Sequence, residues 1–291
     1  MAEKIYRVGI LGAENSHASA FSGIFNGEDS KYPYIKVVGI GGNYPEENKK
    51  VAEKYGIELI AEKPEDLLGK VDALMVTARD GAFHAPFARP FIEQGIPAFI
   101  DKPFTRDIRE AEALVKLAKE KKVPLTGGSS VKSCYDVKML RYQEQKAEKA
   151  GELHGGNVTA PLSMENEYGG FWFYASHLAE ISLSVFGYDP VSVTAFRRQN
   201  DVIALVDYEH FSVTNAFVDG CYSYNATIYR KGSDDFRNID IGMCYEHECE
   251  EFSLMLTHGI MSYSYDQLIK PVRYLAAIKE SYETGKTVGI E

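Results

Sequence analysis

The stretch IYRVGIL-GAENSH, residues 5–17, decides the fold of the first half of the chain. It is a short apolar run that ends in a glycine-bearing turn, a pattern typical of the first strand and first helix of a parallel α/β sheet. Similar runs recur, with amphipathic segments between them. The sequence therefore predicts a doubly wound α/β unit with strands at Ile5–Leu11, Ile35–Ile40, Asp72–Thr77, Pro97–Ile100 and Val123–Thr126, and helices at Pro45–Tyr55 and Asp107–Lys121.

The pattern changes after residue 126. Two helices are predicted first, at Cys134–Ala150 and at the strongly apolar Phe171–Phe186, and a last helix is predicted at Leu268–Tyr282. Between them, segments with the strand period of two residues follow one another without intervening helices, which indicates an open, mainly antiparallel sheet. These segments are Val191–Arg197, Val202–Tyr208, Ser212–Val218 and Tyr222–Arg230. We therefore expect an α/β domain at residues 1–126 and an α+β domain at residues 127–291.

Charge and cysteine content limit the classes of function. The 291 residues include 32 Lys and Arg against 42 Asp and Glu, a formal net charge of −10, which disfavours a nucleic-acid-binding surface. No apolar run approaches the roughly 20 residues of a membrane-spanning helix. Four cysteines are too few and too scattered for a disulfide framework. We expect a cytoplasmic protein that handles small molecules and has no nucleic-acid or membrane partner.

The turn after the first strand matches a dinucleotide-binding fingerprint only in part. Gly12 takes the place of the first glycine, while Glu14 and His17 stand where the second and third glycines are usual. A carboxylate at the second place repels a diphosphate unless it points away or is paired. Asn15, Ser16 and the amides of the following helix still offer phosphate ligands. The alternative is a tight turn with a capped helix that binds no ligand.

The end of the second strand leaves the choice between NAD and NADP open. An acidic residue at this place usually binds the ribose hydroxyls of the adenosine half, but the sequence here is Gly41-Gly42-Asn43. Gly42 and Asn43 leave room for a 2′-phosphate. No basic residue for that phosphate is evident, because Lys49 and Lys50 follow a turn or more away.

The most specific motif is Asp101-Lys102-Pro103, which follows a predicted strand and precedes an amphipathic helix. It resembles the Glu-Lys-Pro motif of the Gfo/Idh/MocA oxidoreductases, with aspartate as a conservative departure. The resemblance extends over essentially the whole chain in the expected order, through Thr77–His84, Gly169-Gly170 with His177, and the closing segment Ala277–Val288. It implies a Rossmann domain and a second domain whose open sheet supports a homodimer or homotetramer.

The resemblance also implies a chemistry. Family members typically oxidise or reduce sugars, polyols and related hydroxy compounds with NAD or NADP. On this chain Lys102 then lies beside the nicotinamide and the reacting oxygen, and His177 exchanges the proton. An ammonium stabilises a developing alkoxide, and imidazole titrates near neutral pH. The implied cofactor-binding residues are Gly12, Ala13, Asn15, Ser16, His17, Gly42, Asn43, Thr77, His84, Asp101 and Lys102, and the implied substrate residues are Trp172, Phe173 and Glu180.

Departures from the family pattern keep other functions open. Many relatives have an aspartate four residues before the histidine, where this chain has Phe173, and Glu180 is an acidic substitute three residues after it. The missing aspartate, together with Glu14 and the absence of an acidic residue after the second strand, favours a pseudoenzyme or ligand-binding regulator as one alternative. A hydrolase or lyase that uses a retained NAD transiently is another. Cys244–Cys249 brings thiols close to an imidazole, but its spacing does not define a metal site, and none is predicted.

Overall fold

The computed structural model describes residues 4–290, which form two compact units. The first contains the chain up to Gly128 together with Tyr245–Leu268, and the second contains Ser129–Cys244 together with the chain from Ile269 onward. Among the described residues, no helix is both long enough and apolar enough to cross a bilayer.

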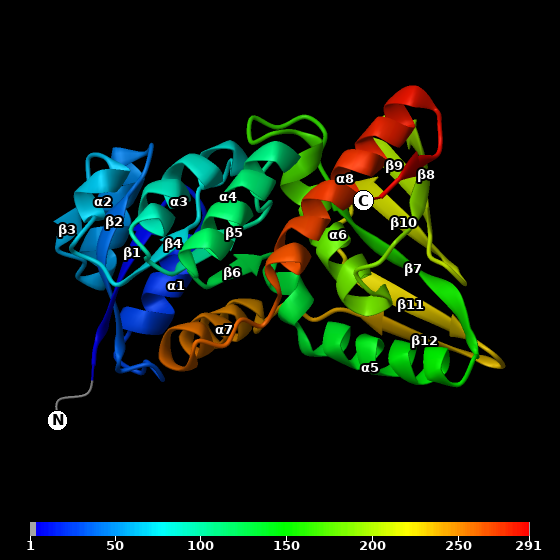
Figure 1. The fold of residues 1–291 in the computed structure, drawn as a ribbon, viewed down its shortest axis with the longest axis horizontal. Helices are drawn as coiled ribbons and strands as arrows, with labels where there is room; N and C mark the ends of the chain where they lie inside the picture. Colours follow the sequence, from blue (N-terminus) through cyan, green and yellow to red (C-terminus); the bar gives the residue numbers. More distant parts are fainter. Residues whose placement is uncertain (1–3, 291) are drawn as a thin grey trace. The chain divides into compact units, whose positions relative to one another are not determined.

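The first unit has a parallel sheet of six strands in the order β3-β2-β1-β4-β5-β6 (Figure 1). The sheet confirms the predicted doubly wound arrangement, because β2 and β4 lie on opposite sides of β1 and the strand order reverses there. Its strands are β1 (Tyr6–Leu11), β2 (Ile35–Gly41), β3 (Leu59–Ile60), β4 (Ala73–Val76), β5 (Ala98–Asp101) and β6 (Leu125–Gly128). The helices between them are α1 (Ser16–Asn26), α2 (Pro45–Tyr55), α3 (His84–Glu93) and α4 (Ile108–Lys121).

Helix α7 (Cys244–His258) completes the core of the first unit, although it lies late in the sequence. Its Cys249, Phe252 and Met255 are buried in the same cluster as Phe25 and Phe99. The boundary drawn from sequence after residue 126 stays a proposal for the domain division. The packing differs from this boundary at α7, which follows residue 126 in the sequence but belongs to the first unit. The apolar side chains of α7 are buried there against residues of the β-sheet and of α1.

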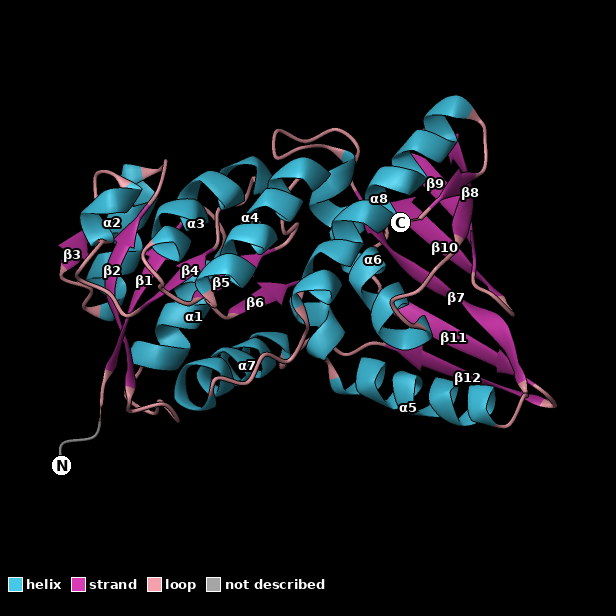
Figure 2. Ribbon diagram, viewed as in Figure 1, coloured by secondary structure: helices cyan, strands magenta, loops and turns pink. Residues whose placement is uncertain are grey.

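The second unit has seven strands in the order β12-β11-β7-β10-β9-β8-β13, and every neighbouring pair is antiparallel except β7 with β10 (Figure 2). This confirms the mainly antiparallel sheet. The strands are β7 (Leu153–Leu162), β8 (Ser192–Arg198), β9 (Asp201–Asp207), β10 (Ser212–Asp219), β11 (Asn225–Arg230), β12 (Ser233–Asn238) and β13 (Val288–Gly289). The helices are α5 (Tyr135–Lys149), α6 (Phe171–Phe186) and the part of α8 (Tyr265–Thr284) that follows Leu268.

One face of the second sheet is packed against helices and the other is open. Tyr274 of α8 is fully buried, and its hydroxyl is hydrogen-bonded to Ser182 of α6 and to Asn215 of β10. Strand residues that alternate with the buried ones point to the other face of the sheet. Large apolar side chains are exposed on that face. The exposed side chains on this open face are Phe196, Ile203, Leu205, Tyr229 and Phe236.

The packing of α7 yields a stability prediction. Phe252→Ala is expected to lower the free energy of unfolding by about 3–5 kcal/mol, because it removes a fully buried ring that contacts Phe25 and Phe99. Leu254→Ala is the matched control, since Leu254 lies on the same helix and is exposed. Urea denaturation measures both, and equal losses would contradict the placement of α7 in the core.

Candidate functional site

The carboxyl ends of β1 and β4 meet at Gly12 and Thr77, where the strand order of the first sheet reverses. The Thr77 hydroxyl donates to the Gly12 carbonyl oxygen at 2.6 Å, and Thr77 is fully buried. Gly12 has a φ of +107°, and a Cβ at this position would lie 2.2 Å from the Ala78 backbone nitrogen. Only glycine therefore allows the two strand ends to approach so closely. In open α/β sheets ligands bind at such a reversal.

Asn15 and Glu14 make hydrogen bonds within the turn after β1. Asn15 caps α1, because its Oδ1 accepts from the His17 backbone N–H at 2.8 Å and its Nδ2 donates to the Thr77 carbonyl at 2.7 Å. The Glu14 Oε1 accepts from the backbone N–H of Arg79 at 2.7 Å, in the loop after β4. The carboxylate at the second fingerprint place is thus tied to the chain by a backbone donor.

His17, at the third fingerprint place, makes a buried side-chain contact with Asp101. The His17 Nδ1 lies in contact with the Asp101 Oδ2, at the end of β5, and both side chains are buried. Burial alone would raise the pKa of Asp101. The charge and hydrogen bond of His17, helped by Lys102 and His84, instead hold that pKa below its ordinary value. Asp101 is therefore an anion on the inside of the first unit.

Lys102 is a buried lysine next to this anion, with 7% of its surface exposed. Burial lowers the pKa of its ammonium from 10.5 to about 8; Asp101 and Glu248 oppose this shift, while Arg79 adds to it. A lysine with such a pKa exchanges a proton near neutral pH far more readily than a surface lysine does. Perturbed titration at a strand end of an α/β sheet marks a candidate active-site group.

The other predicted cofactor residues of the first unit lie on neighbouring loops. Gly42, with a φ of +131°, is so close to Gly12 that a Cβ would lie 2.9 Å from the Gly12 nitrogen. Asn43 is exposed. His84 is fully buried at the start of α3, and its Nε2 is 2.7 Å from the Ala78 carbonyl oxygen. Ala13 is also buried, and the Ser16 hydroxyl is 3.1 Å from the hydroxyl of Tyr245.

In the second unit His177 lies on α6 and is bonded to Ser129. The Nδ1 of His177 is 2.6 Å from the Ser129 Oγ, and the two side chains are buried. The ring of His177 also packs edge-on against Tyr224, with 5.6 Å between ring centroids. Ser129 was not predicted from the sequence, because a serine after two glycines carries no motif of its own.

Glu180 lies one turn after His177 and is bonded to two groups of the segment that follows β6. Its Oε1 accepts from the Ser129 backbone N–H at 3.1 Å, and its Oε2 is 3.1 Å from the Lys132 Nζ. The Lys132 and Glu180 side chains are 1% and 3% exposed, so this is a fully buried ion pair. Lys132 belongs to the 3-10 helix η3 (Ser130–Ser133) and was also missed by sequence reasoning.

Phe173, at the place of the family's aspartate, is buried among aromatic rings. It contacts Tyr168 and Tyr174, with centroid distances of 5.4 Å and 4.8 Å. Trp172 is partly exposed and packs against Phe171. The aromatic start of α6 therefore forms a cluster that provides no charge to His177.

Helix α7 supplies further residues that sequence reasoning missed. The ring of Tyr245 packs on His17 with 4.9 Å between centroids, and Glu248 influences Lys102 electrostatically. Cys249 is fully buried in the apolar core of the first unit. Within residues 4–290, no group of three or more histidine, cysteine, aspartate or glutamate side chains has a geometry that could hold a metal ion.

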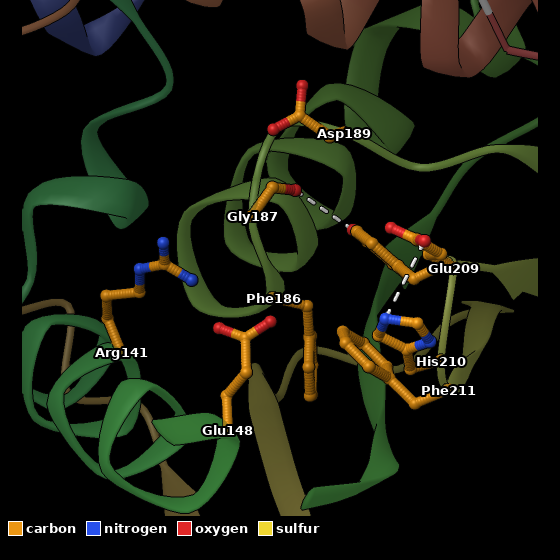
Figure 3. A pocket seen from close by; sticks show the side chains of 9 residues that line it. Arg141, Glu148, Phe186, Gly187, Asp189, Glu209, His210 and Phe211 are labelled. Atoms are coloured by element: carbon orange, nitrogen blue, oxygen red, sulfur yellow. Dashed lines mark hydrogen bonds and ion pairs between the residues drawn. The ribbon is translucent and has the colours of Figure 1, made fainter. Parts of the chain in front are cut away.

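A cavity of about 260 Å³ in the second unit lies between the end of α6 and the turn from β9 to β10 (Figure 3). Arg141 and Glu148 of α5 line it, together with Asp189 and Tyr208, whose hydroxyl donates to the Gly187 carbonyl. None of the residues predicted from the sequence lines this cavity. It is therefore not part of the candidate site.

Comparison with protein families agrees with this geometry. The Gfo/Idh/MocA family model, described as an oxidoreductase family with an NAD-binding Rossmann fold, matches residues 6–129. The matched segment spans the six-stranded parallel sheet of the first unit, from β1 to β6. This segment contains Gly12, Thr77, Asp101 and Lys102. No curated protein matches the sequence.

Solved structures share the fold of the whole chain at low identity. Myo-inositol 2-dehydrogenase from Lactobacillus plantarum is 14% identical with a TM-score of 0.81, and the match covers 99% of this chain and 100% of that one. Scyllo-inositol dehydrogenase from Lactobacillus casei, with bound NAD(H) and scyllo-inositol, is 14% identical with a TM-score of 0.78 and 99% coverage of both chains. GenD2 from gentamicin A biosynthesis, in complex with NAD, is 14% identical with a TM-score of 0.85, covering 99% of this chain and 97% of that one.

The burial of Lys102 yields a prediction for stability. Lys102→Met is expected to raise the free energy of unfolding at pH 7 by up to about 3 kcal/mol, because it removes a desolvated ammonium whose pKa is lowered from 10.5 to about 8. The unfolded lysine keeps its proton up to about pH 10.5, whereas the folded one releases it near pH 8. The advantage of the variant should therefore be full below pH 8 and shrink as the pH rises toward 10.5.

Urea denaturation of wild type and variant at several pH values measures this difference. A variant that is less stable than wild type at pH 7 would contradict the desolvation of Lys102.

Proposed function

We propose that the protein is an NAD(P)-dependent oxidoreductase that transfers hydride to or from a CH–OH group of a sugar-like or polyol substrate. The buried Lys102, with its pKa lowered to about 8, is the observation that carries this proposal. An ammonium at the carboxyl end of β5, in a Rossmann domain, is suited to hold a substrate oxygen and stabilise its charge as the carbinol becomes a carbonyl. Asp101, paired with His17, keeps a negative charge beside it.

The first unit fits a dinucleotide in several respects. Gly12 and Gly42 bring the ends of β1 and β2 close together without side chains, and α1 begins next to them. We propose that Gly12, Ala13, Asn15, Ser16 and His17 hold the diphosphate, that Gly42 and Asn43 face the adenosine ribose, and that Thr77, His84, Asp101 and Lys102 surround the nicotinamide end. The nicotinamide, when bound, supplies the hydride acceptor or donor. The choice between NAD and NADP is left to binding measurements.

His177 is proposed as the acid/base. When the carbinol is oxidised, the hydrogen on its carbon is transferred as hydride to the nicotinamide, and the proton of its hydroxyl passes to the imidazole. In the reverse direction the imidazole returns the proton to the carbonyl oxygen. Trp172 and Phe173, at the aromatic start of α6, are proposed to contact the apolar face of the substrate. The bound scyllo-inositol in the Lactobacillus casei structure supports the polyol class as the first to test.

The open face of the second sheet supports a proposed homodimer or homotetramer. Exposed Phe196, Ile203, Leu205 and Phe236 share this face, and such apolar patches usually mark an interface. The cytoplasmic location stays a prediction from cysteine content.

A ligand-binding regulator is the second candidate. The observation in its favour is that Asn15 already occupies the His17 backbone amide at the start of α1, an amide that a diphosphate would otherwise use. A regulator would bind a nucleotide or sugar without turnover. The hydrolase or lyase alternative would instead retain NAD through purification and show no net redox change.

Turnover of Lys102→Met tests the proposal. With myo-inositol, scyllo-inositol and glucose as substrates, and NAD⁺ and NADP⁺ as oxidants, wild type should form reduced nicotinamide with at least one pair. Lys102→Met should bind the same nucleotide with little change and lose about 100-fold or more in kcat, because the oxygen loses its stabilising charge. Lys50→Met, which removes an exposed lysine paired with Glu47, is the control. Unchanged kcat in Lys102→Met would refute the role of this lysine.

A further inference from the structure

Ser129 is the buried hydroxyl that contacts the ring of His177. We propose that Ser129 is the positioning residue for His177, in place of the carboxylate that α6 lacks, and that the buried Glu180–Lys132 pair holds Ser129 for this task. The inference rests on the proposed role of His177 as the acid/base. It adds a residue that neither the motif nor the fold assigns.

The geometry of the ring supports this assignment. Ser129 Oγ lies 2.6 Å from His177 Nδ1, a short distance for a hydrogen bond between a hydroxyl and an imidazole. Ser129 is fully buried and His177 is 7% exposed, so bulk water does not compete for the bond. Because Nδ1 is engaged by Ser129, proton exchange is placed at Nε2. Tyr224 packs edge-on against the ring and restricts its rotation further.

Glu180 fixes the backbone of Ser129. It lies three residues after His177, so both side chains project from one face of α6. The Glu180 Oε1 accepts from the Ser129 N–H, and its Oε2 is held by the Lys132 ammonium. An ion pair in which both side chains are almost fully buried is costly to break, so the segment 129–132 is tied to α6 at two points. The hydroxyl of Ser129 is thus presented to the ring from a fixed backbone.

A serine affects the imidazole differently from an aspartate. Phe173 occupies the place four residues before His177 and offers no polar atom. A carboxylate only accepts, so it fixes the proton on Nδ1, whereas a hydroxyl both donates and accepts. With proton exchange at Nε2, Nδ1 carries a proton in both the neutral and the protonated ring, so the Ser129 Oγ can accept from it in both states without adding charge. The ring keeps one orientation in both directions of proton transfer.

The test combines a spectroscopic signature with kinetics. In protein with ¹⁵N-labelled histidine, and with the His177 signals assigned from His177→Gln, Ser129→Ala should shift the His177 Nδ1 resonance. Ser129→Thr, which keeps the hydroxyl, should leave it near the wild-type position. Kinetics are measured with the substrate that wild type turns over fastest. Ser129→Ala should lower kcat about tenfold to a hundredfold with KM for the nucleotide little changed, and Ser129→Thr should retain most of the wild-type kcat.

Ser130→Ala is the matched control, because it removes a buried hydroxyl from the next residue. It should leave the His177 resonance in place. An unchanged Nδ1 resonance in folded Ser129→Ala would overturn the proposal. A shifted resonance with unchanged kcat in Ser129→Ala would refute its positioning role, whereas unchanged kcat in His177→Gln would refute His177 as the acid/base, so the failure of the inference is distinguishable from that of the proposed function.

Discussion

The burial of the Lys102 ammonium is the constraint that explains the arrangement of charged side chains around it in the first unit. A charge taken out of water is costly unless opposite charges lie beside it, and here Asp101 and Glu248 provide them. Asp101 is itself kept anionic by His17, whose ring is covered by Tyr245. Two of these residues come from α7, so a helix from late in the sequence is required both for the core and for the charge balance around the lysine.

The second unit also buries a lysine beside an acid, with a different result. Lys132 and Glu180 lie 3.1 Å apart and form a closed pair, so their role is to hold a backbone segment. For Lys102, burial outweighs the charges of Asp101 and Glu248, and its pKa falls to about 8. We therefore propose that the same residue type serves as a reactive group in the first unit and as a structural tie in the second.

The sequence predicted the regular elements well and the supporting contacts poorly. Helices α2 and α6 begin and end at the predicted residues, because Pro45 starts one and glycines border the ends of both. The prediction omits β7 (Leu153–Leu162), whose two glycines and proline weaken the strand pattern. It also omits α7, whose charged first turn hides its apolar face. The buried partners Ser129 and Lys132 carry no motif, and only the fold brings them to α6.

The central claim is that the altered turn after β1 still binds a nicotinamide dinucleotide. Glu14 is tied to the Arg79 backbone N–H and Asn15 caps α1, so the claim depends on the remaining donors and on the space left by Gly12 and Gly42. Calorimetric titration of the purified protein with NAD⁺, NADH, NADP⁺ and NADPH, after a check for co-purified nucleotide, measures this directly. The account predicts micromolar binding of one oxidised and reduced pair. No binding of any of the four, with no nucleotide retained, would contradict it.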